Sequence, residues 1–168
     1  IAHKAKEEDF VENMFISNTH DDIMLFSNAG KVYTIKGYEI PEATKQAKGR
    51  AIVNLLELQP EEKISAIVPV NGIKEDEYLF MATKNGIVKK THCKEYANIR
   101  KTGIQAITLR DNDELIEVKA TDLSKEIFLA TKYGYCIRFK ETDVRPTGRS
   151  SMGVIGMNLM EGDEVIGM

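Results

Sequence analysis

The stretch Tyr78-Leu79-Phe80-Met81-Ala82-Thr83-Lys84-Asn85-Gly86-Ile87-Val88-Lys89 decides the fold, because residues 22–33 and 126–137 repeat its pattern. Each copy has four apolar or small residues, a Ser or Thr, two variable residues, a Gly and a second apolar-rich run. Runs rich in Val, Ile, Phe, Tyr and Thr on both sides of a turn glycine are typical of β-hairpins. The pattern therefore predicts three hairpins, each with a glycine at its tip to supply a positive φ.

A second glycine follows each hairpin glycine at a nearly constant interval. The pairs are Gly30 and Gly49, Gly86 and Gly103, and Gly134 and Gly153, separated by 19, 17 and 19 residues. A strand-like run, an acidic turn and a final apolar run come after each second glycine. Four short strands in a unit that recurs after 56 and then 48 residues are typical of a propeller-like array.

The predicted fold class is all-β, a propeller-like array of four-stranded blades with about three to four blades in this chain. We expect one domain over residues 1–168, divided into approximate repeats at 1–21 (partial), 22–76, 77–125 and 126–168. The only helix-like stretch, at 41–48, is short and crosses between strands. Residues 7–10 match the acidic turn and last strand of an incomplete repeat, so we expect a piece of a larger domain cut within a repeat at both ends.

Composition excludes several classes of protein. The 168 residues are 42% hydrophobic and 29% charged, which is enough to bury a core and argues against disorder. No apolar run approaches the roughly 20 residues of a membrane span, so no membrane partner is expected. Cys93 and Cys136 are too few for a disulfide scaffold, which predicts a reducing, cytoplasmic setting.

The charge of the chain is sorted by position within the repeat. The net charge is −3, yet the equivalent windows 30–50, 84–104 and 132–152 hold 16 basic and 5 acidic residues. Because stacked repeats place equivalent positions on equivalent faces, folding should gather these cations into a basic band. Such a band binds a polyanion by releasing condensed counterions, and this predicts a nucleic acid as the partner, bound through its phosphates without sequence preference.

The candidate DNA-binding residues are the lysines and arginines near the hairpin tips and in the loops around the second glycines. They are Lys31, Lys36, Lys45, Lys48, Arg50, Lys84, Lys89, Lys90, Arg100, Lys101, Lys132, Arg138, Lys140, Arg145 and Arg149. An alternative from a different class stays open, in which the basic band of a propeller-type interaction module binds an acidic protein.

No catalytic or metal-binding arrangement is recognisable. The three histidines are scattered without zinc-ligand spacing, and there is no Gly-x-Ser-x-Gly nucleophile elbow. Acidic turns such as 111–114 lack the glycine and distal glutamate of an EF-hand and are expected to be solvated turns. The sequence therefore predicts a domain that is not an enzyme by itself, with no metal site and no cofactor.

Residues 25–33, 40–44, 47–56, 80–91 and 138–145 closely resemble the C-terminal domain of the bacterial DNA gyrase A subunit. The resemblance implies a β-pinwheel, a disc of usually six four-stranded blades that exchange strands with their neighbours. It also implies that DNA bends around a basic rim, and that this wrapping supports ATP-dependent negative supercoiling. Its implied partners are the gyrase B subunit, together with the remainder of the A subunit, in an A2B2 holoenzyme of the bacterial cytoplasm and nucleoid. The family's catalytic tyrosine, ATP site and Mg²⁺ site lie elsewhere in that holoenzyme.

One departure from the family pattern concerns its Gln-Arg-Arg-Gly-Gly-x-Gly box, which this chain does not contain. Counting by repeat, the box would fall immediately before Ile1. The equivalent loops at 45–50, 98–103 and 148–153 are degenerate but keep positive charge beside the glycine. We therefore expect a fragment that binds DNA but lacks the box needed for complete wrapping and supercoiling.

Overall fold

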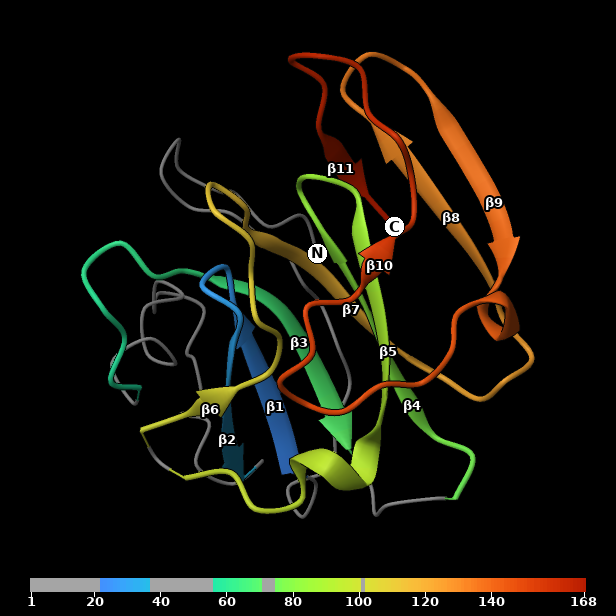
Figure 1. Cartoon of the computed structure of the whole chain (residues 1–168). Coiled ribbons are helices and arrows are strands. Elements are labelled where there is room, and N and C mark those ends of the chain that lie inside the picture. The colour runs from blue at the N-terminus through green and yellow to red at the C-terminus, as the bar shows by residue number, and fades with distance from the viewer. Residues whose placement is uncertain (1–21, 37–55, 71–74, 101) are drawn as a thin grey trace, which may run out of the picture.

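The computed structural model describes residues 22–36, 56–70, 75–100 and 102–168, which form short strands and two single 3-10 turns (Figure 1). The elements are β1 (Asp22–Ser27), β2 (Lys31–Lys36), β3 (Ile64–Val70), β4 (Tyr78–Thr83), β5 (Ile87–His92), η3 (Cys93–Tyr96), β6 (Ile104–Gln105), β7 (Leu115–Thr121), β8 (Glu126–Thr131), β9 (Cys136–Lys140), η4 (Glu141–Asp143), β10 (Val154–Ile155) and β11 (Val165–Gly167). The partial repeat expected at 1–21 and the helix-like stretch at 41–48 lie outside the described residues.

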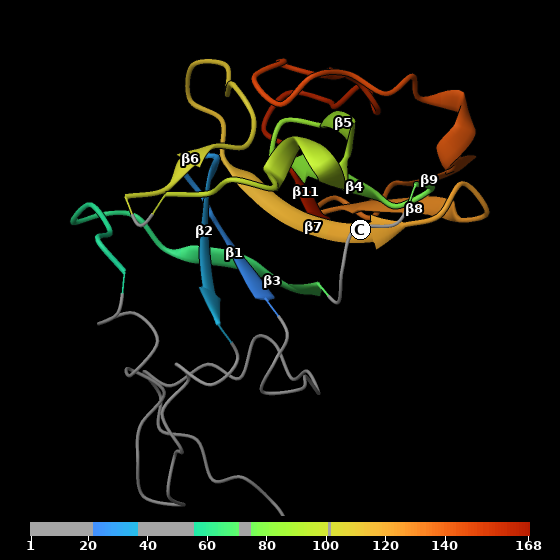
Figure 2. The ribbon, with the colours of Figure 1, turned by 90° about the horizontal axis from the view of Figure 1, so that it is seen from below.

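The strands form three antiparallel sheets, in the orders β3-β1-β2-β6, β10-β5-β4-β7 and β11-β8-β9. Each sheet is built on one of the expected hairpins, with the final apolar run of the same repeat beside the hairpin's first strand. Figures 1 and 2 show the sheets following one another in chain order. The prediction of an all-β, propeller-like fold is confirmed.

The hairpin tips are tight turns that depend on their glycines. Gly30, Gly86 and Gly134 have φ of 80°, 86° and 89°, which only glycine adopts without strain. In each turn the glycine N–H donates to the carbonyl of the Ser or Thr three residues earlier, at 3.0–3.1 Å. The repeated Ser/Thr-x-x-Gly pattern is therefore the sequence signature of this turn.

The strands after Gly103 and Gly153 belong to the sheet of the preceding repeat. Val32 on β2 pairs with Ile104 on β6, and Val88 on β5 pairs with Val154 on β10. The sequence predicted four strands per repeat, and the structure shows that the fourth strand of the first two sheets is supplied by the next repeat. This exchange joins consecutive blades through backbone hydrogen bonds.

The exchanged segment also covers the hairpin tip of the sheet that it joins. The N–H groups of Ala106 and Ile107 donate to the carbonyl of Gly30 at 2.7 and 3.2 Å. Those of Gly156 and Met157 donate to the carbonyl of Gly86 in the same way, at 2.8 and 3.2 Å. The apolar residues four and six positions after Gly103 and Gly153, which are Ile107 and Leu109, and Met157 and Leu159, therefore pack over the neighbouring hairpin tip.

Apolar cores fill the spaces between consecutive sheets. Phe26 packs with Leu79 and Met81 of the second sheet, and Phe80 packs with Ile127 and Leu129 of the third. Both phenylalanines are fully buried because the next sheet covers them, whereas Phe128, the equivalent of Phe80 in the third repeat, is 50% exposed. These phenylalanines are thus core residues where a following sheet covers them.

The acidic turns are not merely solvated, which corrects the sequence-based expectation. A carboxylate oxygen of Asp113 accepts hydrogen bonds from the N–H groups of Asn85 and Glu114, each 2.8–2.9 Å long. Asp163 accepts from the N–H of Tyr133 in the third repeat, at 3.0 Å. Each carboxylate thus anchors its own repeat's hairpin tip, which explains why acidic residues recur at this phase.

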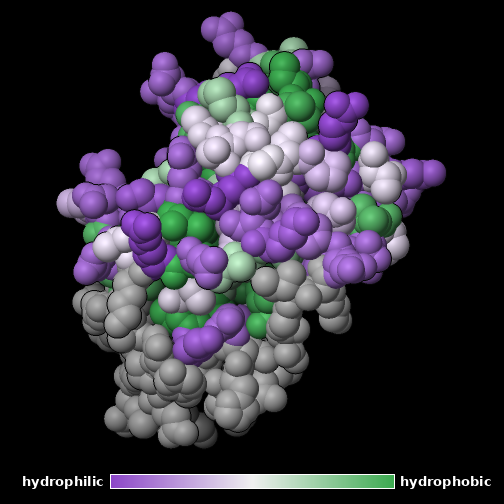
Figure 3. All heavy atoms as spheres, turned by 60° about the horizontal axis from the view of Figure 1, so that its bottom comes forward, coloured by the Kyte–Doolittle hydropathy of each residue, from purple (hydrophilic) through white to green (hydrophobic). Residues whose placement is uncertain are grey.

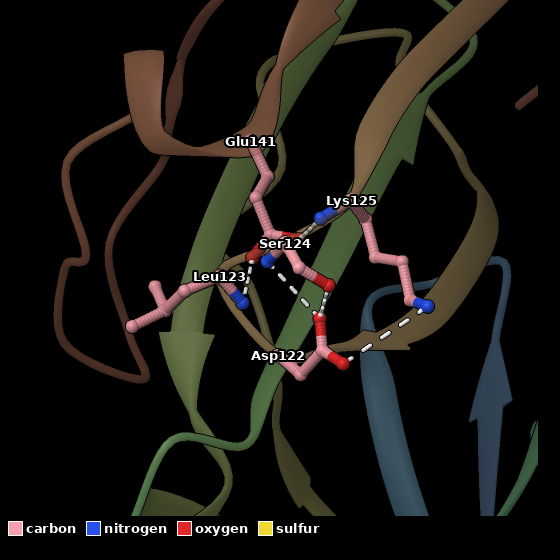
Figure 4. A network of polar contacts seen from close by, with 5 residues as sticks. All are labelled: Asp122, Leu123, Ser124, Lys125 and Glu141. Atoms are coloured by element: carbon pink, nitrogen blue, oxygen red, sulfur yellow. Dashed lines mark hydrogen bonds and ion pairs between the residues drawn. The ribbon is translucent and has the colours of Figure 1, made fainter.

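The connection from β7 to β8 is organised around a fully buried carboxylate (Figure 4). Glu141 accepts hydrogen bonds from the N–H groups of Leu123 and Lys125, both at 2.8 Å. Asp122 caps the same turn by accepting from Ser124. These bonds hold Leu123 at a φ of 74° and fix the start of the third repeat against η4.

Candidate nucleic-acid interface

Eleven of the fifteen candidate DNA-binding residues lie in the described part of the chain. The other four are Lys45, Lys48, Arg50 and Lys101, whose structure is not described and whose role stays a prediction.

Lys89 and Lys90 are buried, and the structure removes them from the set of candidate DNA contacts. Their exposed fractions are 1% and 2%, although both lie in a basic window of the sequence. The amino group of Lys89 donates to the carbonyls of Ala106, at 2.5 Å, and Arg149. Lys90 donates to the carbonyl of Glu141 at 3.0 Å and lies over the Tyr78 ring. Counting charges in the sequence could not reveal this burial. Lys89 and Lys90 point to opposite faces of β5, and later segments of the chain cover both faces.

Lys36 and Arg138 are exposed but have carboxylate partners. Lys36 pairs with Asp22 across the first hairpin. The Nε atom of Arg138 lies 3.9 Å from a carboxylate oxygen of Glu126 across the third hairpin. Exposed pairs of this kind are weak, so both cations remain able to exchange partners, but they add little net positive charge.

The seven remaining described candidates are exposed or half-buried. They are Lys31, Lys84, Arg100, Lys132, Lys140, Arg145 and Arg149. Figure 3 shows hydrophilic side chains over much of the visible face of the described part, with smaller apolar areas among them.

Arg100 and Arg149 are the two candidates that the structure brings together most clearly. They come from the second and third repeats and line one open pocket of about 530 Å³, with Lys94 as a third cation. Glu95 is the single carboxylate among its lining residues. We call Lys94, Arg100 and Arg149 the cross-repeat basic cluster.

The arginine of the third repeat is held in place by the second repeat. One guanidinium nitrogen of Arg149, Nη1, donates to the carbonyl of Gln105 at 2.7 Å. Thr108 ties the same two loops together by donating its hydroxyl to the carbonyl of Ser150, at 2.6 Å. A guanidinium carries five N–H donors in a planar fork, so most of them remain available to an anion. Gln105 is also the strand partner of Lys31, which places a cation of the first repeat beside this loop.

Lys94 is a residue that the sequence analysis left out of the candidate set. It lies in a basic window and is exposed on η3, where its backbone N–H donates to the Nδ1 atom of His92 at 3.1 Å. Its signal was the same phase-locked charge that selected its neighbours. No sequence pattern near Lys94 predicts that it lies close to Arg149, because the two residues are brought together by the exchange of strands between repeats.

The buried amino group of Lys89 makes the stability of the fold depend on pH. Burial, with a smaller contribution from the nearby Arg149 and a partial offset from Glu95, lowers the pKa of Lys89 to about 7. The same group titrates near 10.4 in an unfolded chain. Between these values the unfolded state binds more protons than the folded state, so stability rises with pH, and the burial cost is greatest below pH 7.

We therefore expect the free energy of unfolding to rise between pH 7 and 8.5, by at most about 1.4 kcal/mol per pH unit from this group. Urea unfolding at pH 6.5, 7.5 and 8.5 measures the effect, and Lys89→Met should lack this contribution. The series stops below pH 9 because of Cys93, whose pKa burial raises from its ordinary value of 9.0 to about 12. Above about pH 9 the thiol loses its proton in the unfolded chain but keeps it in the folded chain, so stability falls as the pH rises. Parallel pH curves for the two proteins would show that Lys89 does not titrate in this range.

Other chemistry has no support in the described residues. Among them, no three His, Cys, Asp or Glu side chains gather closely enough to hold a metal ion. Both cysteines are free thiols, with Cys93 buried and Cys136 exposed. Within the same residues, no helix is long and apolar enough to cross a membrane.

A family model described as "DNA gyrase C-terminal domain, beta-propeller" matches residues 21–71, 77–122 and 125–168. Curated relatives include the DNA gyrase A subunit of Clostridium acetobutylicum, 50% identical over 92% of this chain and 19% of the relative. The DNA gyrase A subunit of Escherichia coli K12 is 47% identical over 99% of this chain and again 19% of the relative. The chain thus spans about a fifth of the length of these relatives.

Solved structures with this fold agree with the family match. A crystal structure of the C-terminal domain of DNA topoisomerase IV superposes with a TM-score of 0.85 at 33% identity, covering 98% of this chain and 51% of the other. A structure of the DNA gyrase A C-terminal domain gives a TM-score of 0.72 at 30% identity, over 90% of this chain and 48% of the other. The chain therefore spans about half of each of these solved domains.

Proposed function

This chain belongs to the family of DNA gyrase C-terminal domains, and from that membership we propose that it binds duplex DNA without sequence preference and bends it along a basic surface. The observation that carries the proposal is the cross-repeat basic cluster, in which Lys94, Arg100 and Arg149 of two repeats line one pocket. Exchange of strands converts a charge pattern spread along the sequence into cations that are close in space.

The proposed mode of binding uses phosphate contacts and little base recognition. Phosphate contacts position a duplex but carry no sequence information, which suits a surface that must accept almost any sequence. Bending 20–30 base pairs costs on the order of 1–6 kcal/mol, so several weak contacts must act together to offset it. Exposed or half-buried cations distributed over successive repeats, such as Lys84, Lys132 and Arg145, provide such contacts.

In its full-length context, we propose that the domain supports ATP-dependent negative supercoiling by DNA gyrase without catalysing a step itself. The B subunit of gyrase, together with the remainder of its A subunit in an A2B2 holoenzyme, is the proposed partner, and the bacterial cytoplasm and nucleoid are the proposed location. The similarity to A subunits of gyrase supports these proposals. The proposed domain uses no cofactor of its own, and ATP and Mg²⁺ act elsewhere in the holoenzyme.

A binding titration with random-sequence duplex DNA at about 50–300 mM salt tests the proposal. If all seven remaining candidates contact phosphates, the logarithm of the binding constant should fall with the logarithm of salt with a slope of about −6. Two duplexes of unrelated sequence should bind equally, and a circularly permuted set of fragments should report bending. Absence of DNA binding, with salt-sensitive binding of an acidic protein, would instead support the interaction-module alternative.

A further inference from the structure

We infer that the pocket lined by the cross-repeat basic cluster is a subsite for one DNA phosphate, and that Lys89 is the buried residue that positions its third-repeat arginine. The inference rests on the proposed function and names the place where two repeats act on the same phosphate.

The pocket has the chemistry of an anion site. Lys94, Arg100 and Arg149 supply three cations against one carboxylate, that of Glu95, and the pocket is open to solvent. Its wall includes Gly103, whose φ of 80° and close approach to the Tyr33 ring leave no room for a side chain. Two planar guanidinium groups and one ammonium group in an open pocket suit a phosphate of a backbone that passes across the opening.

Lys89 is buried and connects the two segments that carry the cluster. Its amino group donates to the carbonyl of Ala106, in the loop that follows Arg100, and to the carbonyl of Arg149. The Ala106 carbonyl also accepts from the hydroxyl of Tyr96 on η3, at 3.0 Å. One buried side chain therefore fixes the backbone that carries Arg149 against the repeat that carries Lys94 and Arg100.

Packing alone does not account for a lysine at this position. An apolar side chain of similar length would fill the same space without removing an amino group from water. Only a donor can hold both carbonyls. The equivalent positions in the first and third repeats are Tyr33 and Ile137. A lysine at this position is therefore found only in the second of the three repeats.

Lys90 offers a matched control for Lys89. It is the next residue on β5, is equally buried, and also donates to a backbone carbonyl of the third repeat. That carbonyl belongs to Glu141 on η4 and not to the pocket. Replacing either lysine by methionine removes one buried amino group, but only Lys89→Met removes a hydrogen bond to the backbone of Arg149.

The test compares Lys89→Met, Lys90→Met, Arg149→Gln and the double variant Lys89→Met/Arg149→Gln in the 168-residue chain, with random-sequence duplex DNA as the probe. Lys89→Met and Arg149→Gln should each lower the magnitude of the salt slope by about 0.9, the value of one phosphate contact. The double variant should lose no more than either single variant, because both remove the same contact. Lys90→Met should keep the wild-type slope.

The outcomes separate the inference from the proposed function. If the unmodified chain does not bind DNA, the proposed function fails and the inference fails with it. If the chain binds DNA but Lys89→Met keeps the slope, or its effect adds to that of Arg149→Gln, the inference alone is overturned. Circular dichroism and thermal unfolding establish that each variant is folded before its slope is compared.

A second measurement on the unmodified protein covers the case in which Lys89→Met does not fold. Reductive methylation read by mass spectrometry should modify Lys94 in the free protein, and bound DNA should protect it. Lys89 should stay unmodified in both states, and Lys125, which lies outside the pocket, should react equally in both. Equal reactivity of Lys94 with and without DNA would overturn the phosphate subsite.

Discussion

Replacing Gly86 by alanine should lower the free energy of unfolding by about 2–5 kcal/mol, clearly more than the same replacement of Gly134. Both glycines occupy the tip of a hairpin, with φ of 86° and 89°, so alanine carries a similar backbone penalty of roughly 1–2 kcal/mol at either site. At Gly86 a new Cβ would also lie 2.6 Å from the carbonyl oxygen of Met157, in the segment exchanged from the third repeat. At Gly134 it would meet nothing within 4 Å.

The difference between the two variants isolates the contact between blades. Overpacking of this kind costs about 1–3 kcal/mol, and relief by movement would break the hydrogen bonds from Gly156 and Met157 to the Gly86 carbonyl. Urea unfolding of the wild type, Gly86→Ala and Gly134→Ala at one pH measures it. Equal destabilisation by the two substitutions would show that the exchanged segment does not hold the hairpin tip in solution.

Much of this fold could be predicted from the sequence because its turns are local. The Ser/Thr-x-x-Gly pattern and the positive φ at Gly30 concern a few adjacent residues, and the same pattern occurs three times. The destination of the strand after Gly103 could not be predicted from spacing, because β6 fits the edge of its own sheet and that of the neighbour equally well by composition. The actual pairing with β2 depends on three-dimensional closure over Gly30.

The candidate site shows the same division between local and long-range information. Phase-locked charge selected cations around the second glycines, among them Arg100 and Arg149; the structure places these two in one pocket, and their contact with DNA stays a prediction. It was wrong for Lys89 and Lys90, since a count of charge assumes that every lysine reaches solvent. These two lysines differ from the others because later segments of the chain supply carbonyl groups that accept their hydrogen bonds. The sequence around the lysines gives no sign of these partners.

Neutralising four cations of the proposed DNA surface together should weaken DNA binding by roughly 100-fold or more at moderate salt. The variant changes Lys94, Arg100, Arg145 and Arg149 to glutamine; all four lie in loops or on η3 and are exposed or half-buried. The magnitude of the salt slope should fall by about 1.8, which is about 0.9 for the phosphate that Lys94, Arg100 and Arg149 share and about 0.9 for the phosphate that Arg145 contacts. The loss should be the same for duplexes of unrelated sequence, because phosphates and not bases are contacted.

A second variant with the same change in net charge provides the control. Lys63, Arg110, Lys119 and Lys125 are exposed cations outside the three basic windows, and their replacement by glutamine removes the same four charges. Because the Debye length is about 8 Å at 0.15 M salt, distant charges are largely screened, so this control should keep a slope close to that of the wild type. Two equal losses would mean that DNA responds only to net charge and would remove the basis for a localised surface. A loss confined to one DNA sequence would instead mean that these side chains recognise bases.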